Sequence, residues 1–308
     1  MFECSIPGLL LKRLLESLKD ICTDVNLECN QQGISMQAMD NSHVALVHLQ
    51  LPVEFFAEYR CDHGCILGIN IPHMLKVLNI VKENSEVFLS KSDSDEDDTD
   101  SLRIAIYDAE TLDNIADDDQ KRAETLTVDL KMVDMEKEHL DIPESNHTCT
   151  CTMKSKKFQE IVRYLNTVGE SSKSFKFKLE KLLVFMSAPA PVLIFCLPTL
   201  CSVTITIEKH HLLLEADGDS IKVKKQFRNL VNDVFVTSTE PISQEFATRY
   251  LVMFSRASSI AESVSLGLSA NIPLSLRFGI GSKSGVADME LEDVASLSFF
   301  LAPKIDEE

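Results

Sequence analysis

Five short segments of the sequence alternate apolar and polar residues, and this alternation limits the fold more than any other feature. They read SHVALVHLQL, SLRIAIYD, SVTITIEK, SIKVKKQF and SVSLGLSA. Successive side chains of a β-strand point to opposite faces, so a period of two that is rich in β-branched residues is typical of half-buried antiparallel strands. The chain therefore has to build sheets that bury one face each.

Four segments between these runs are predicted to form amphipathic helices. They are Gly8–Asp20, Pro72–Glu83, Lys154–Thr167 and Ser243–Ala257. The first carries a leucine stripe at helical spacing. The second begins with proline, where a missing N–H costs little, and the fourth is predicted to begin at Ser243 as its N-cap. Each half of the chain thus repeats the order helix, strands, helix, strands, which predicts two similar α+β domains.

A charged stretch, residues 126–144, joins the two halves. Pro143 near its end disfavours helix at the residue before it, so we predict an extended connector. The predicted division is an N-terminal domain of residues 1–125, the connector of residues 126–144, and a C-terminal domain of residues 145–308.

Positive charge is concentrated on the predicted helices of an acidic chain. The 308 residues carry a net charge of −18, which taken alone argues against a partner such as DNA. The four helical spans hold 11 Lys and Arg against five Asp and Glu, a net charge of +6, and the remainder holds 19 against 43, a net charge of −24. One interpretation is that each helix has an ordinary solvated face. The other is that the four helices line one concave surface and follow a phosphate backbone without reading bases.

No pattern of residues predicts an enzyme. The sequence has no Gly-rich phosphate loop and no nucleophile elbow. Cys61, His63 and Cys65 could supply three soft ligands, but a second, distant pair of zinc ligands is not evident, so a turn between strands is the better interpretation. We therefore expect no catalytic residue, no metal and no cofactor. Nine cysteines without an even, spaced framework favour reduced thiols in the nucleus or cytosol.

Several motifs together resemble one known family. They are MFE, LKRLLESLKD, MQAMDNSHVALVHLQL, YRCD, HLDIPE, ANIPL and FFLAPKIDEE, which span nearly the whole chain. On these residues the chain resembles the proliferating cell nuclear antigen family, the eukaryotic DNA sliding clamps. The resemblance implies an α+β fold of two similar sliding-clamp domains, each with two helices packed on antiparallel sheets. It also implies a closed homotrimeric ring in the nucleus, with the helices inside and the sheets outside.

The resemblance implies a set of DNA-facing residues that overlaps the basic faces found from charge. Pairs of basic residues seven positions apart lie on one helix face, and this spacing adds Lys156 to the set. Glu160 departs from the family, which commonly has a basic residue there. The predicted DNA-facing residues are Lys12, Arg13, Lys19, Lys76, Lys156, Arg163, Arg249 and Arg256.

The resemblance also implies a pocket beneath the connector for short partner peptides. DNA polymerase, clamp loader, flap endonuclease and DNA ligase are the implied partners, each inserting a helical turn with apolar and aromatic anchors. Phe300 stands where the family often has Tyr, so a polar contact is lost. The predicted pocket residues are Met39, His43, Val44, Leu46, Leu140, Ile142, Pro143, Pro273, Phe300, Ala302 and Pro303.

Two further features follow from the resemblance. Subunits of the ring are expected to meet through edge strands near Thr127–Val133 and Ser220–Lys225, because edge pairing satisfies backbone groups and removes exposed edges. Lys209 matches a lysine that the family uses for ubiquitin-type modification.

Residues 173–201 form an insertion relative to the family. Within it, residues 182–201 carry no charge and have the length of a membrane span, but Pro189, Pro191 and Pro198 would interrupt a helix. Three interpretations stay open: a translated intron, a surface loop, or a membrane anchor.

These observations are compatible with three functions. The first is a processivity clamp that encircles duplex DNA and recruits replication and repair proteins. The second is a subunit of a heterotrimeric checkpoint clamp of the same fold, and the third is a membrane-tethered protein. The LDIP and LAPKI segments, which belong to the peptide pocket, favour the first.

Overall fold

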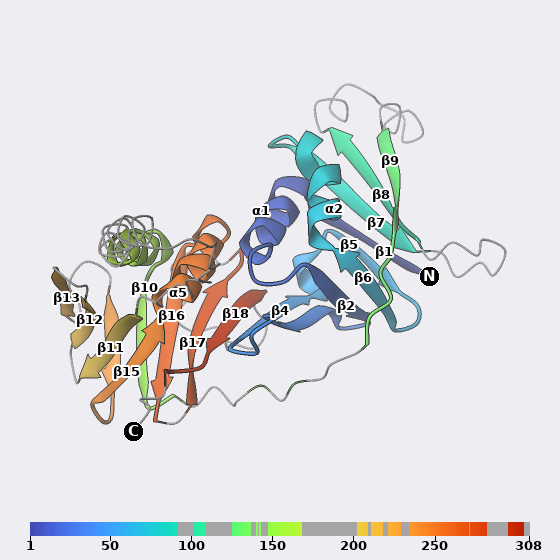
Figure 1. The fold of residues 1–308 in the computed structure, drawn as a ribbon. Coiled ribbons are helices and arrows are strands. Elements are labelled where there is room, and N and C mark those ends of the chain that lie inside the picture. The colour runs from blue at the N-terminus through green and yellow to red at the C-terminus, as the bar shows by residue number, and fades with distance from the viewer. Residues whose placement is uncertain are drawn as a thin grey trace, which may run out of the picture. The chain divides into compact units, whose positions relative to one another are not determined.

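The computed structural model describes most of the chain and divides it into two compact units. It describes residues 1–91, 101–108, 125–136, 140, 142, 147–167, 202–208, 211–217, 221–228, 234–270, 272–281 and 295–304. By contacts, the first unit contains Met1–Ile142, Arg256–Glu262 and Arg277–Phe299, and the second contains the rest. Figure 1 shows short helices and antiparallel strands in each unit.

The first unit has two sets of antiparallel strands. A five-stranded sheet has the order β5-β1-β7-β8-β9, and a second set has the order β6-β2-β3-β4. The strands are β1 (Phe2–Pro7), β2 (Asp24–Asn30), β3 (Gly33–Met39), β4 (Ala45–Pro52), β5 (Glu58–Cys61), β6 (Cys65–Asn70), β7 (Ser85–Lys91), β8 (Ser101–Asp108) and β9 (Thr125–Lys131). Strand β2 buries alternate residues, as period-two patterning predicts, whereas β1 buries Cys4, Ser5 and Ile6 in succession.

Two α-helices pack side by side in the described part of this unit (Figure 1). Helix α1 (Gly8–Leu18) buries its leucine stripe, and the glycine at its start allows close packing, since a Cβ there would lie 2.7 Å from Val81. Helix α2 (Ile71–Val77) is capped by Asn70, whose side chain accepts a hydrogen bond from the backbone N–H of His73. It continues as the 3₁₀ helix η2 (Leu78–Ile80), and a 3₁₀ turn, η1 (Val53–Phe55), follows β4. The second predicted helix is therefore shorter than Pro72–Glu83.

The second unit repeats the same kinds of element. One sheet has the order β13-β12-β11-β15, and a second run has the order β14-β10-β16-β17-β18, whose last two strands are divided between the units. The strands are β10 (Cys149–Lys154), β11 (Ser202–Glu208), β12 (His211–Asp217), β13 (Lys222–Arg228), β14 (Phe235–Ser238), β15 (Ile242–Ala247), β16 (Ser263–Ser269), β17 (Ile272–Gly279) and β18 (Ser296–Leu301).

The helices of the second unit correct one prediction. A helix is described over residues 155–167, as predicted, but the fourth helix is α5 (Thr248–Phe254), followed by the 3₁₀ helix η3 (Ser255–Ser259). The prediction of helix over 243–247 was wrong, because these residues belong to β15 and pair with β11. Ser243 does not cap a helix, and its hydroxyl hydrogen-bonds that of Thr206 at 2.8 Å.

All five alternating segments contain strands in the structure, namely β4, β8, β11, β13 and β16. The pairings within the two units are antiparallel, and helices pack on the sheets. The predicted α+β class with two similar domains is confirmed. Residues 173–201 lie outside the described residues, and no helix within the described part of the chain is long and apolar enough to cross a membrane.

Candidate nucleic-acid interface and partner surfaces

The first unit places basic side chains on the outer faces of both its helices. On α1, Arg13 is exposed and Lys12 is half-buried, on the side opposite the buried leucines, and Lys19, the C-cap residue, is exposed. On the neighbouring α2, Lys76 is exposed. Two exposed carboxylates, Glu16 and Asp20, lie beside them. The sequence places these cations correctly because the helical period separates them from the apolar stripe.

In the second unit, the helix of residues 155–167 has an exposed face with mixed charge. Lys156, Glu160 and Arg163 are exposed and lie on one face, since they are spaced by four and three residues. The opposite face is buried. The amide nitrogen Nε2 of Gln159 donates to the backbone carbonyl of Ser255 at 2.8 Å, which fixes this helix to the start of η3.

The two predicted arginines near α5 have different environments. Arg249 is exposed, but its guanidinium lies 4.7 Å from the ring centre of Tyr250 and donates to the Tyr250 hydroxyl at 3.0 Å. This contact orients the cation without neutralising it. Arg256 lies in η3 and forms an ion pair with Asp20, and their side chains are 39% and 32% exposed. Arg256 is therefore already partly neutralised.

The excess of positive charge on the helices persists with the observed boundaries. Over the described helices and the 3₁₀ segments η2 and η3, eight Lys and Arg stand against two Glu, a net charge of +6. The predicted spans gave the same net charge over longer segments. The observed fourth helix begins after Glu245, so this carboxylate does not lie on a helix. The helices therefore carry fewer acidic residues than predicted.

The β3–β4 turn, which carries several predicted pocket residues, is organised by one carboxylate. Asp40 is buried and accepts from the backbone N–H groups of Ser42, Val44 and Ala45 at 3.1, 2.8 and 2.7 Å. His43 adopts a positive φ of 54° within this turn. Charge-assisted bonds of this kind are strong. Of the predicted pocket residues here, Met39 and Leu46 are cross-strand partners, Val44 is half-buried and His43 is exposed.

The connector is hydrogen-bonded to β6 and to a side chain of β3. The backbone N–H of Val133 donates to the carbonyl of Gly68 at 3.0 Å, and that of Leu140 donates to Oε1 of Gln37 at 3.0 Å. A Cβ on Gly68 would lie 1.8 Å from the Val133 carbonyl oxygen, so only glycine allows this approach. Leu140 and Ile142 are half-buried, whereas Pro143 lies outside the described residues.

The C-terminal predicted pocket residues lie in the second unit, and Lys304, which follows them, contacts β15. Lys304 donates its backbone N–H to the carbonyl of Glu245 at 2.8 Å, and its Nζ lies 3.4 Å from the same residue's carboxylate. This double contact fixes the course of the tail. Pro273, Phe300, Ala302 and Pro303 are half-buried. Lys209, the predicted modification site, lies outside the described residues.

Among the described strands, each unit ends one sheet with a strand that is paired on one side only. Strand β9 is the last strand of the five-stranded sheet, and β13 is the last strand of the four-stranded sheet. Exposed apolar side chains lie on or beside both edges, with Leu126 45% and Ile221 53% exposed. Unpaired, partly apolar edges of this kind favour pairing with another chain.

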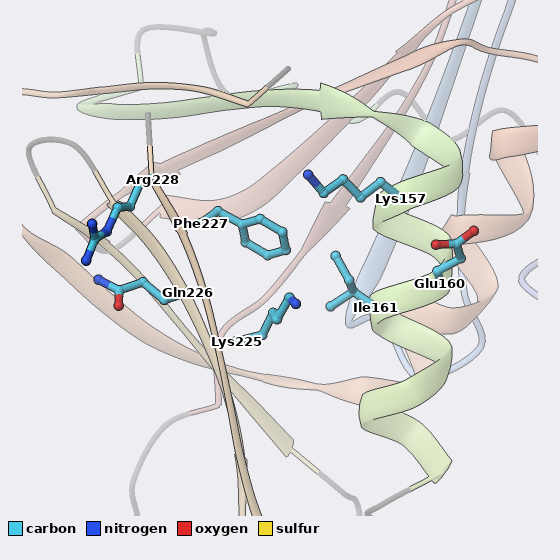
Figure 2. A pocket seen from close by; sticks show the side chains of 7 residues that line it. All are labelled: Lys157, Glu160, Ile161, Lys225, Gln226, Phe227 and Arg228. Carbon is cyan, nitrogen blue, oxygen red and sulfur yellow. The ribbon is translucent and has the colours of Figure 1, made fainter. Parts of the chain in front are cut away.

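A cavity of about 370 Å³ lies between β13 and the helix of residues 155–167. Figure 2 shows Lys157 and Ile161 projecting from the helix towards Phe227 on the strand. The ammonium of Lys157 lies 5.1 Å from the centre of the Phe227 ring. The sequence pattern did not predict this cavity. The available signal was a single aromatic residue in the otherwise basic segment SIKVKKQF.

The predicted turn at Cys61, His63 and Cys65 is confirmed, since it connects β5 to β6. Among the described residues, no group of three or more His, Cys, Asp or Glu side chains could hold a metal ion.

Comparison with known proteins assigns a family to both halves of the chain. The profile of the proliferating cell nuclear antigen N-terminal domain matches residues 1–139, and that of the C-terminal domain matches residues 199–304. The protein named proliferating cell nuclear antigen 2 of Plasmodium falciparum (isolate 3D7) is 46% identical over 305 residues, 99% of each chain. Proliferating cell nuclear antigen of Chaetomium thermophilum is 31% identical over 299 residues, 97% of this chain and 96% of the relative.

Proposed function

Because the chain belongs to the proliferating cell nuclear antigen family, whose members are non-enzymatic sliding clamps, we propose that three copies close into a ring around duplex DNA. The protein is a DNA polymerase processivity factor. The observation that carries the proposal is the net charge of +6 on the helices of a chain whose total charge is −18. A basic lining inside an acidic ring holds DNA without sequence preference.

We assign the DNA contacts to the exposed cations of the four helices. Arg13, Lys19 and Lys76 serve in the first unit, and Lys156, Arg163 and Arg249 serve in the second. Lys12 is half-buried and Arg256 is paired with Asp20, so these two contribute less. The contacts are few, so bare affinity for DNA is weak and falls with salt.

Ring closure is proposed to occur by pairing of β9 of one copy with β13 of the next. Such head-to-tail contacts generate a ring when the rotation closes. The cavity beside β13 supports this assignment, because it has an apolar wall of Ile161 and Phe227 that a side chain from the neighbouring edge could fill. Both exposed edges are then satisfied.

Light scattering coupled to gel filtration tests this assembly. The wild-type chain is expected to elute as a homotrimer at micromolar concentration. Ile161→Arg places a charge in the cavity wall and is expected to give monomers with an unchanged circular dichroism spectrum. The matched control is Phe235→Arg, at a 55% exposed apolar position in β14, which should remain trimeric. A wild-type chain that stays monomeric would instead favour a subunit of a heterotrimeric clamp.

Partner proteins are proposed to bind through short peptides at the surface made by the β3–β4 turn and the connector of the first unit, and the family resemblance adds Pro273, Phe300, Ala302 and Pro303 of the second unit. Polymerase, clamp loader, flap endonuclease and ligase are the classes of partner expected, and the family implies a nuclear location. Leu140→Asp is expected to weaken binding of a peptide with apolar and aromatic anchors by at least about tenfold in calorimetry, since a buried hot-spot contact is lost. Leu126→Asp, in β9, should bind the peptide normally. Equal affinities for both variants would contradict this surface.

We also propose a domain division, a modification site and an origin for the insertion. The domains are residues 1–125, the connector 126–144 and residues 145–308, and Lys209 is the ubiquitin-type modification site. For residues 173–201 we favour a translated intron. Mass spectrometry of the native protein tests this, because detection of peptides from Phe177–Cys201 would exclude it.

A further inference from the structure

Four cysteines of the first unit lie close enough to influence one another electrostatically. Strand β5 ends the five-stranded sheet and carries Cys61, while β6 ends the other set of strands and begins at Cys65. Cys4 lies on β1 beside β5, and Cys29 lies on β2 beside β6. No family motif quoted above contains Cys4, Cys29 or Cys65 in a functional role, and neither DNA nor peptide binding uses them.

Cys29 and Cys65 have the arrangement that a disulfide needs. They are directly opposite each other in the antiparallel pair of β2 and β6. Burial alternates along both strands so that Cys29 shares its face with Val25 and Leu27, and Cys65 shares its face with Leu67. Opposite residues on antiparallel strands have Cα atoms roughly 4.5–5.5 Å apart, inside the roughly 4.4–6.8 Å range of disulfides. The two thiols therefore need no movement of the backbone to meet.

The four thiols differ in reactivity, and Cys65 is the exceptional one. A hydrogen bond with the Cys29 thiol, the charge of Lys91 and a further contact with Cys61 lower the pKa of Cys65 to about 7. Burial raises the pKa of Cys4 to about 12, and burial also raises the pKa of Cys61. Cys65 is half-buried, whereas the other three are buried. A thiolate with this exposure is the nucleophile of the group at neutral pH.

We propose that Cys65 and Cys29 form a peroxide-responsive thiol pair that is oxidised to a disulfide between β6 and β2. The Cys65 thiolate attacks one oxygen of hydrogen peroxide. The O–O bond breaks, and the leaving hydroxide takes up a proton to become water. Cys65 is left as a sulfenic acid. The sulfur of Cys29 then attacks the Cys65 sulfur, the S–O bond breaks, and the second water leaves with the Cys29 proton. Two thiols lose two electrons and one peroxide gains them.

The bridge has a structural consequence for a neighbouring contact. Strand β6 also carries Gly68, whose carbonyl accepts the connector's Val133 N–H at 3.0 Å. A disulfide ties this edge strand to β2 and so restrains the strand on which the connector rests. The oxidation state of Cys29 and Cys65 is therefore linked to the connector, which is part of the proposed partner surface. This link depends on the position of the pair and needs no metal or cofactor.

Mapping of disulfides in the full chain tests the proposal directly. Reduced protein is treated with a small excess of hydrogen peroxide at neutral pH, its thiols are blocked with N-ethylmaleimide, and it is digested with trypsin without reduction. Cleavage after Lys19, Arg60 and Lys76 places Cys29 in the peptide 20–60 and Cys65 in the peptide 61–76. We expect the two peptides to be joined. A bridge confined to peptide 61–76, a sulfinic acid at Cys65 without a bridge, or unreacted thiols would each overturn the proposal.

Variants assign the bridge to the two residues. Peptide 20–60 also contains Cys22, and peptide 61–76 also contains Cys61, so Cys22→Ser and Cys61→Ser are the matched controls. Both are expected to keep the cross-link, while Cys29→Ser and Cys65→Ser lose it. Independently of any variant, iodoacetamide should label Cys65 first among the cysteines of residues 1–167 in the wild-type chain. Its labelling rate should rise through about pH 7, and slower labelling of Cys65 than of Cys4 would contradict its role as the nucleophile.

Discussion

A single carboxylate interrupts the basic face of residues 155–167. Glu160 is exposed between Lys156 and Arg163, where it repels phosphate and competes for the neighbouring cations. Glu160→Lys is expected to raise affinity for duplex DNA several-fold at low salt and to steepen the salt dependence by about one phosphate contact. Fluorescence anisotropy over a salt series measures both. Glu240→Lys makes the same change of charge in an exposed turn outside the helices, and an equal gain there would mean that net charge alone acts.

His48 on β4 predicts how the first unit responds to acid. Burial, and secondarily the charge of Arg277, lower the pKa of His48 to about 4, from an unfolded value of about 6.5. Between these two values the unfolded chain binds a proton that the folded chain does not, so stability is full above about pH 6.5 and falls as the pH drops towards 4.

The measurement for His48 is urea unfolding at pH 7 and pH 5. Between pH 7 and pH 5, the free energy of unfolding of His48→Gln is expected to fall by roughly 1 kcal/mol less than that of the wild-type chain. This figure is reduced for the partial exposure of the ring. His73→Gln removes an exposed histidine and should follow the wild-type chain. If both variants have the same pH dependence, His48 is not the group responsible.

The contact between Gly68 and the connector is sterically strict. Gly68→Ala places a Cβ 1.8 Å from the Val133 carbonyl oxygen, so the connector has to move and the Val133 hydrogen bond weakens. We expect a loss of roughly 1–3 kcal/mol in the free energy of unfolding and faster tryptic cleavage after Lys131. Gly64→Ala is the matched control, since its Cβ would meet only the Cys29 carbonyl at 3.7 Å. Equal proteolysis of the two variants would show that this contact does not hold the connector.

The fourth helix shows why some element boundaries could not be predicted from the sequence. The segment 243–257 reads as one amphipathic helix because Phe246, Tyr250 and Phe254 recur at helical spacing, and all three are buried. The first of them nevertheless lies in β15, where pairing with β11 supplies the backbone hydrogen bonds. Strand pairing is a contact between residues far apart in the chain, so it overrides a local pattern that is equally compatible with helix.

Much of the basic surface, by contrast, follows from local pattern. The exposed cations of α1, α2 and the 155–167 helix lie where the 3.6-residue period places them. What the pattern could not supply is the pairing of Arg256 with Asp20, because the two residues are distant in sequence. The cavity beside β13 was missed for the same reason, since its walls come from residues 157–161 and 225–228.

At the scale of the whole molecule, weak contacts and firm retention have to coexist. Six exposed cations in the described part of each chain cannot hold DNA tightly at physiological salt, whereas a closed ring holds it by topology. Protein placed on a nicked circular duplex by a clamp loader and ATP should therefore stay bound through a high-salt wash and leave when the circle is cut. Ile161→Arg, which is expected to prevent closure, should not be retained on either form.

The same experiment separates enclosure from adhesion. If the basic faces held DNA by themselves, retention would depend on salt and would be equal on circular and linear duplexes. Under enclosure, Glu160→Lys changes the affinity of free protein but leaves retention on the circle unchanged, because the rate of escape is set by opening of the β9 and β13 edges. Gel filtration of labelled protein with each DNA form measures the retained fraction. Escape from circles at the same rate as from linear duplexes would rule out a closed ring.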